Sequence, residues 1–111
     1  MAIPIGNEGS FNSTNAVTVL AAPASSKQRV IPTHGLSVYN ADTAAVDVIV
    51  QKNKNSTARV IYKKVGLAAG ATDSMPNKVV LDATDESLEV KLGGAIATTQ
   101  PVFDVAAAEY P

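Results

Sequence analysis

LSVYNADTAAVDVIVQKNKNSTARVIYKKV, residues 36–65, is the stretch that decides the fold. Within it Val46, Val48 and Val50 fall on one face and Asp47 on the other, and this period of two indicates a half-buried strand. Two polar turns, NADT at 40–43 and NKNS at 53–56, separate three runs rich in β-branched residues. Asn suits such turns because it tolerates a left-handed backbone and bonds its own main chain. The stretch therefore predicts an antiparallel meander of three strands.

Further short strands are expected on both sides of the meander. Residues 88–92 (LEVKL) alternate most cleanly, which indicates one buried and one solvated face. Pro32 and Pro76 have no amide to donate, so they belong at strand ends or edges. About seven or eight short strands, separated by turn signals, predict one antiparallel β-sandwich, either jelly-roll or immunoglobulin-like. The pattern leaves the strand order open. The other expected strands are 16–22, 28–31, 78–81 and 102–107.

The composition predicts a single domain with a small core. The chain has 111 residues, the length of one domain, and a domain of this size buries roughly two-thirds of its unfolded surface. It has two Phe, three Tyr and no Trp, so the core must consist mainly of Val, Ile and Leu. We expect such a domain to gain stability from association with other subunits.

Charge and targeting signals exclude several classes of partner. Nine Lys and Arg against ten Asp and Glu give a net charge of −1, which offers no basic field for nucleic acid. With no Cys there is neither a disulfide framework nor a thiolate metal site. The chain opens without a basic and then apolar leader, and no window approaches the ~20 apolar residues of a membrane span. We therefore expect synthesis and assembly in a cytoplasm, with no membrane partner.

Residues 1–15 are rich in Gly, Asn and Ser, and they have two interpretations. The first is a loose terminus, because chain ends are often poorly ordered unless tied down. The second is an extended arm, separate from a sandwich at 16–111, that lays Ile3, Ile5 and Phe11 onto a neighbouring subunit. On the second interpretation, deletion of the arm leaves the sandwich folded.

No pattern in the chain predicts a catalytic, cofactor or metal site. His34 is the only histidine, and a catalytic base needs a nucleophile and an orienting carboxylate that no motif supplies. The loop at 66–72 lacks the Lys-Ser/Thr ending of a phosphate-binding loop. Four clustered acids could supply oxygen ligands for a cation, but their spacing does not match the EF-hand pattern. They are Asp82, Asp85, Glu86 and Glu89. We expect no enzyme, no cofactor and no small-molecule substrate.

Basic residues gather on the hairpin at 51–65, and acidic residues gather between 73 and 89. Either these are ordinary solvated faces, or the basic hairpin of one copy faces the acidic turns of another copy or of a partner lattice. In the second case the charges would set register and orientation. Nucleic acid is disfavoured because Tyr62 is the hairpin's only aromatic. The five basic residues are Lys52, Lys54, Arg59, Lys63 and Lys64.

Two stretches, 35–72 and 80–110, together resemble small structural proteins of tailed bacteriophages, encoded near the major capsid protein. The resemblance is carried by LSVYN at 36–40 with its Asp-Thr turn, by LDATDESLE at 81–89 and by TTQPVF at 98–103. These are strand and turn signatures, and no functional residue is transferred from the family.

The resemblance implies a β-sandwich protein of the virion exterior. It implies a capsid decoration or cement protein, a homotrimer that binds the outer surface of the major capsid lattice and stabilises it after assembly in the host bacterial cytoplasm. The alternative is a receptor- or carbohydrate-binding module on the tail or capsid exterior. Such a module would present exposed aromatics, and those available are Phe11, Tyr39, Tyr62, Phe103 and Tyr110.

Overall fold

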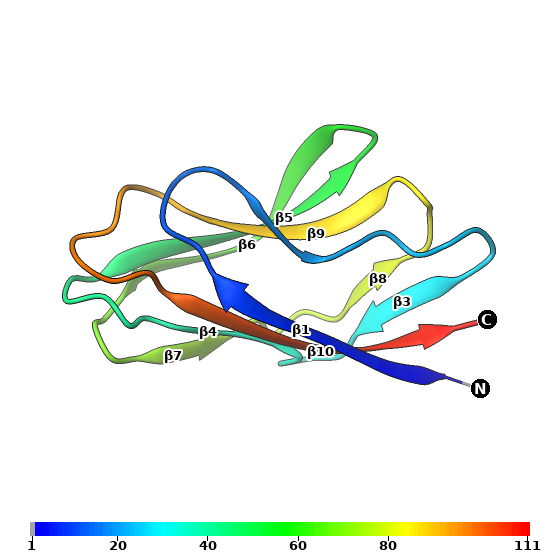
Figure 1. Ribbon diagram of the computed structural model, residues 1–111, viewed down its shortest axis with the longest axis horizontal. Coiled ribbons are helices and arrows are strands. Elements are labelled where there is room, and N and C mark those ends of the chain that lie inside the picture. Colours follow the sequence, from blue (N-terminus) through cyan, green and yellow to red (C-terminus); the bar gives the residue numbers. More distant parts are fainter. Residues whose placement is uncertain (1) are drawn as a thin grey trace.

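The computed structural model describes residues 2–111, and these form ten strands and no helix. The strands make two antiparallel sheets packed face to face, as the all-β prediction expects (Figure 1). One sheet has six strands and the other has four, in the order β2-β9-β5-β6. The strands are β1 (Ile3–Ser10), β2 (Val17–Leu20), β3 (Gln28–Ile31), β4 (Leu36–Tyr39), β5 (Val46–Lys54), β6 (Thr57–Leu67), β7 (Thr72–Ser74), β8 (Val79–Leu81), β9 (Glu86–Leu92) and β10 (Val102–Tyr110).

The pairing of β10 identifies the topology as a jelly roll. β1 pairs with β10 along residues 102–109 and so occupies one whole edge of that strand. Both β4, at residues 102–105, and β3, at 108–110, must therefore lie end to end on the other edge. β7 and β8 flank β4 and β3 in the same way. If β3 with β4, and β7 with β8, are each counted as one interrupted strand, the chain has eight strands, numbered 1 to 8 in chain order. The strand order is then 1-8-3-6 in one sheet and 2-7-4-5 in the other. This is the arrangement of an eight-stranded jelly roll.

The step between β3 and β4 depends on a close approach at Gly35. His34 has a φ of 63°, and the amide of Ala106 donates to the Gly35 carbonyl at 2.8 Å. A Cβ atom on Gly35 would lie 2.8 Å from the Ala106 carbonyl oxygen. Only glycine fits where the interrupted strand crosses so near to β10.

The core lies between the sheets and is lined by alternate residues of each strand. Val46, Val48 and Val50 on β5 are all buried, and every second residue of β9 is buried as well. This confirms the alternation predicted for both stretches. The predicted meander is correct only for its second and third strands. β4 pairs with β10 and β7 in the other sheet, because the chain at 40–45 crosses between the sheets.

Residues 3–10 form a strand of the sandwich rather than a separate arm. β1 adds eight residues in register to the edge of β10, and the Asn7 side-chain amide donates to the Val19 carbonyl at 3.1 Å. Phe11, which follows, is only 1% exposed, and its ring centroid lies 6.3 Å from that of Phe103. The boundary predicted at residue 15 therefore does not separate the described part of this segment from the fold. Met1, also part of that prediction, lies outside the described residues.

Candidate functional site

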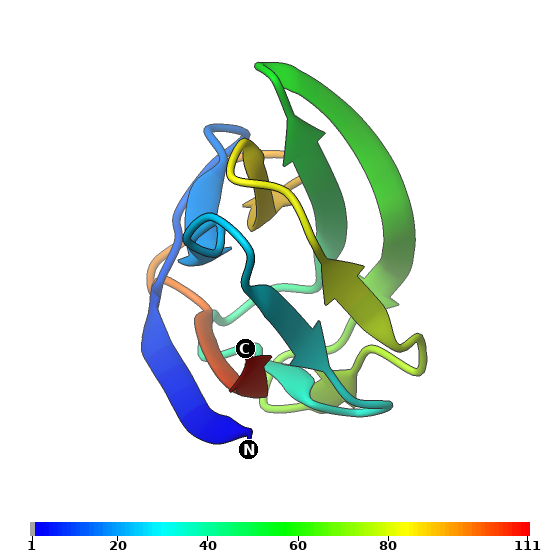
Figure 2. The same cartoon turned by 90° about the vertical axis from the view of Figure 1, so that its right-hand side faces the viewer.

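The β5–β6 hairpin brings three of the five predicted basic residues together. Lys52 and Arg59 are directly opposite each other in the hairpin register, and Lys54 ends β5. They line an open cleft of about 560 Å³ that also includes Asp85, in the turn before β9, and Glu86, the first residue of β9. The tip of the hairpin stands out from the body of the molecule (Figure 2). The hairpin thus presents a basic cleft near a projecting turn.

Lys52 forms an ion pair within the chain. Its Nζ atom lies 3.2 Å from Glu86 Oε2, and the Asp82 amide donates to Glu86 Oε1 at 3.0 Å. Burial acts to raise the pKa of Glu86, but the Asp82 amide and the Lys52 ammonium outweigh it and hold that pKa below its usual value. In the cleft, Lys54 and Arg59 are therefore the cations that remain for a partner.

Lys63 and Lys64 do not extend this cleft into one patch. Lys63 is opposite Ile49 and Lys64 is opposite Val48, whose side chain is buried in the core. Neighbouring residues of a strand point to opposite faces. Lys63 thus lies on the outer face of the four-stranded sheet, whereas Lys64 is half-buried on the inner side. The predicted basic set is divided between two surfaces.

Most of the acids predicted to face a basic partner have partners within the chain. The Tyr62 hydroxyl donates to Asp73 at 2.7 Å, and burial together with this carboxylate raises the pKa of Tyr62 to about 12. Glu89 accepts from the Gln51 side chain at 2.7 Å, and Glu86 is paired with Lys52. The turns at 73–89 are consequently not a free acidic patch.

The exposed acidic pair lies on the other sheet, where the sequence did not indicate one. Glu8 on β1 and Asp104 on β10 are directly opposite in register. They line a shallow hollow of about 500 Å³ on the six-stranded sheet. Tyr39 and Val102, which are 43% and 41% exposed, line the same hollow. Only the pairing of residues 96 positions apart brings these carboxylates together.

The three apolar residues predicted as subunit contacts have different environments. Ile3 is 54% exposed and is available at the start of β1. Ile5 is half-buried and packs against the core. Phe11 belongs to the core itself, so in this fold it cannot reach a neighbouring subunit. The prediction was wrong for Phe11 because its large side chain fills the space between the sheets.

Asp42 forms a buried anchor that sequence reasoning missed. Its carboxylate accepts from the backbone amides of Ala97, Thr98 and Thr99 at 2.8 to 3.1 Å. These hydrogen bonds, above all that from Ala97, hold the pKa of Asp42 far below its usual value. The Asn40 side-chain amide also donates hydrogen bonds to the Leu67 and Ala44 carbonyls. Three loops between strands of the jelly roll are thereby held together at one end of the sandwich. The sequence signal for this anchor is the Asn-x-Asp spacing at 40–42, although by itself this spacing predicts only a turn.

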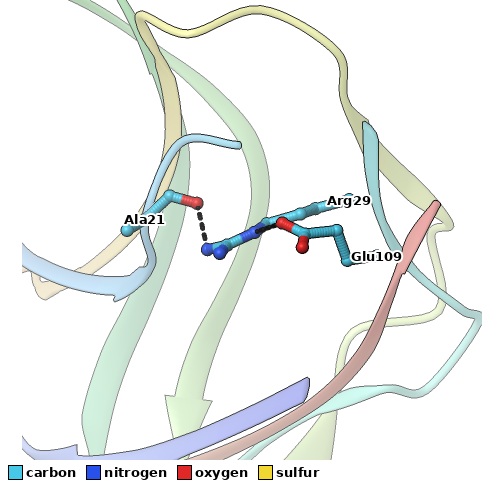
Figure 3. Close-up of polar contacts among 3 residues, drawn as sticks. All are labelled: Ala21, Arg29 and Glu109. Atoms are coloured by element: carbon cyan, nitrogen blue, oxygen red, sulfur yellow. Dashed lines mark hydrogen bonds and ion pairs between the residues drawn. The ribbon is translucent and has the colours of Figure 1, made fainter. Parts of the chain in front are cut away.

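A second polar anchor joins the two sheets near the other end. Arg29 on β3 makes an ion pair with Glu109 on β10, with Nε and Oε1 2.9 Å apart. Its guanidinium also donates to the Ala21 carbonyl beyond β2 at 2.9 Å (Figure 3). Every buried side-chain nitrogen or oxygen among the described residues has a hydrogen-bond partner. These internal polar groups therefore serve the fold.

His34 meets a hydroxyl but does not form a catalytic triad. Its Nδ1 atom lies 2.7 Å from Ser74 Oγ on β7. Among residues 2–111, no carboxylate hydrogen-bonds the other ring nitrogen to orient it, as such a triad requires. The same residues contain no group of three His, Cys, Asp or Glu side chains suited to a metal ion. They also contain no helix long and apolar enough to cross a membrane.

The jelly roll is similar to several solved structures at low sequence identity. One is the Bacillus endospore appendage, described as a disulfide-linked pilus, with a TM-score of 0.56 and 11% identity over 99% of this chain and 86% of that chain. Another is a chain of the cyanophage Pam1 capsid asymmetric unit, with a TM-score of 0.54 and 13% identity over 99% and 85%. A third belongs to infectious bursal disease virus, Gt strain, with a TM-score of 0.51 and 13% identity over 98% of this chain and 32% of that one. No protein-family model and no curated protein matches the sequence.

These likenesses establish the fold. Capsid proteins of viruses are among the fold neighbours, and so is a pilus protein. At identities of 11–13% the shared property is the sandwich itself. The disulfide linkage named for the pilus has no counterpart, because this chain has no cysteine.

Proposed function

We propose that the protein is a virion structural protein of a tailed bacteriophage, which decorates the outer surface of the major capsid lattice and stabilises it. It acts by binding alone, as a homotrimer, after assembly in the host cytoplasm. The sequence resemblance at 35–72 and 80–110 supports this role. So does the jelly-roll fold, which viral capsid proteins share.

The observation that carries the proposal is the outer face of the six-stranded sheet. The exposed face of a sheet is normally polar or charged. On the four-stranded sheet Lys63, Glu89 and Lys91 follow this rule, while Val60 and Val65 on β6 are also exposed, at 53% and 66%. The six-stranded sheet exposes Tyr39, Val102 and Tyr110 among small side chains, and the outward positions of β1, β3, β4 and β10 carry only two charges. Such a face favours a protein that works in contact with other subunits.

Contacts with the capsid lattice are then assigned to exposed residues away from this face. Ile3, at the start of β1, offers an apolar contact, and Lys63 offers a cation on the four-stranded sheet. Half-buried Ile5 and Lys64 contribute less. The basic cleft with Lys54 and Arg59 is left for a sister copy.

Capsid stabilisation provides the test. Shells prepared without the protein are heated in its presence and absence, and the midpoint of shell disruption is recorded. Because a ligand that binds only the intact shell stabilises it by an amount that grows with the logarithm of the ligand concentration, we expect the midpoint to rise steadily with the logarithm of protein concentration once the shells begin to bind it. An unchanged midpoint at saturating protein would contradict the proposal.

A carbohydrate- or receptor-binding module is the second candidate, favoured by one observation. Tyr39 is exposed in a hollow that also holds Glu8, Ser10 and Asp104, an arrangement of aromatic and polar groups that suits a sugar. Binding to a glycan array that persists in high salt and is lost in Tyr39→Ala would support this candidate. Absence of any glycan binding would contradict the carbohydrate-binding form of this candidate.

A further inference from the structure

The outer face of the six-stranded sheet is almost free of charge. The buried residues of β10 alternate with outward ones, and the register identifies the outward residues on its neighbours. Among these positions only Glu8 and Asp104 are charged. The others are Pro4, Gly6 and Ser10 on β1; Gln28 and Val30 on β3; Ser37 and Tyr39 on β4; and Val102, Ala106, Ala108 and Tyr110 on β10.

The two charges on this face have the same sign and are directly opposite each other. Like charges at opposed positions of an antiparallel pair destabilise the sheet. Neither Glu8 nor Asp104 makes an ion pair among the described residues, whose two ion pairs are Arg29–Glu109 and Lys52–Glu86. A face with few charges and an uncompensated acidic pair fits a partner that brings cations to that point.

We propose that this face binds the tip of the β5–β6 hairpin of a second copy, with Lys54 and Arg59 of that copy placed against Glu8 and Asp104. Lys54 and Arg59 are exposed and have no ion pair among the described residues. Their aliphatic stems can cover Tyr39 and Val102 while the charged groups reach the carboxylates. This contact concerns self-association, so it stands or falls independently of binding to a capsid.

The hairpin tip is built as a rigid projection. Asn55 and Ser56 have φ values of 51° and 65°, as a two-residue turn of the type that matches strand twist requires. The Asn55 amide donates to the Asp85 carbonyl at 3.1 Å, which ties the tip to the turn before β9. A rigid element loses little conformational entropy on binding. The tip also stands clear of the sandwich (Figure 1), so a second copy can approach it.

The two surfaces belong to different sheets, so the contact joins unlike surfaces of successive copies. A contact of this head-to-tail kind forms a ring if the rotation between copies closes, and a filament if it does not. The homotrimer of the proposed function would be a closed ring with three such contacts. Each copy then buries one acidic face and presents one basic hairpin.

Charge reversal tests the contact through the mass of the protein in solution. The hollow variant carries Glu8→Lys and Asp104→Lys, the hairpin variant carries Lys54→Glu and Arg59→Glu, and a third protein carries all four changes. Light scattering at low salt should show the wild type as an oligomer. Each double variant should associate about tenfold or more weakly, because close opposed charges are replaced by like charges. The fourfold variant should recover the oligomer, because both signs are exchanged.

A matched control separates this contact from a general effect of charge. Lys27→Glu with Lys91→Glu makes the same charge change as the hairpin variant, but on the loop before β3 and on the four-stranded sheet. It should leave the mass unchanged, and thermal unfolding should verify that every variant folds. A wild type that stays monomeric at low salt and high concentration overturns the proposal, as does a hollow variant that keeps the wild-type mass. Loss of capsid stabilisation with self-association intact would instead overturn the proposed function.

Discussion

Asp42 carries more of the fold's polar connections than any other single side chain described above. One carboxylate collects backbone amides from residues 97–99 while Asn40 beside it secures the chain after β6. Asp42 is buried, and an Asn side chain there would place an amide donor against backbone amides that now donate to a carboxylate, which destabilises the folded state. Asp42→Asn should therefore lower the midpoint of thermal unfolding measured by circular dichroism. The control Asp104→Asn, at an exposed position, relieves a like-charge pair and should not lower it; equal effects would contradict the anchor.

The same carboxylate predicts how stability depends on pH. Because the pKa of Asp42 is lower in the folded chain than its usual value of 3.8, the folded state favours the ionised form. The stabilisation is complete above pH 3.8 and is lost as pH falls toward the lower folded pKa. Between pH 5 and pH 2 the wild type should lose more thermal stability than Asp42→Asn. Parallel pH profiles for the two proteins would show that Asp42 is not the titrating group.

At the scale of elements, the interrupted β3–β4 line depends on Gly35. Gly35→Ala forces a Cβ atom against the Ala106 carbonyl, and crowding of this kind costs about 1–3 kcal/mol of unfolding free energy. Gly94→Ala is the matched control, since a Cβ atom there meets nothing within 4 Å. Urea unfolding of both variants measures the difference. A Gly35 variant as stable as the Gly94 variant would contradict the close approach.

We expect β1 and the residue after it to unfold together with the rest of the sandwich. Deletion of residues 1–15 removes the partner of β10 along one edge and takes Phe11 out of the core. Loss of a buried Phe side chain alone costs about 3–5 kcal/mol. We therefore expect the truncated chain to unfold at much lower temperature than the full chain, or not to fold. A cooperative transition at the wild-type temperature would restore the interpretation of this segment as a separate arm.

The positions of the strands could be predicted from the sequence better than the pairing between strands could. Alternation identifies which face of β5 or β9 is buried, but it does not say which strand lies beside another. For that reason β4 was assigned to the wrong sheet. β1 was missed because Asn7 and Gly9 occupy inward positions between Ile5 and Phe11, so the period of two was hidden. The basic residues of the candidate site were found on the expected hairpin, whereas Glu8 and Asp104 meet only through long-range pairing.

At the scale of the whole molecule, the two sheets have unlike outer faces. The four-stranded sheet carries mixed charges, with Val60 and Val65 exposed on β6. The six-stranded sheet carries small side chains and few charges, and it is acidic at one point. If the opposed charges Glu8/Asp104 and Lys54/Arg59 join copies, the assembly must weaken as salt rises, because exposed charges are screened beyond about 8 Å at 0.15 M. Light scattering across a salt series should show a falling mass. A mass independent of salt would point to an apolar contact alone.

The central claim is that the protein binds a capsid lattice as an assembled subunit. Co-sedimentation with shells that lack it tests this most directly, with the bound copies per capsid subunit measured as the protein is titrated. We expect saturation at a fixed ratio of bound copies to capsid subunits. Protein that stays in the supernatant at every concentration would contradict the claim and would leave the exposed Tyr39 hollow as the site to test.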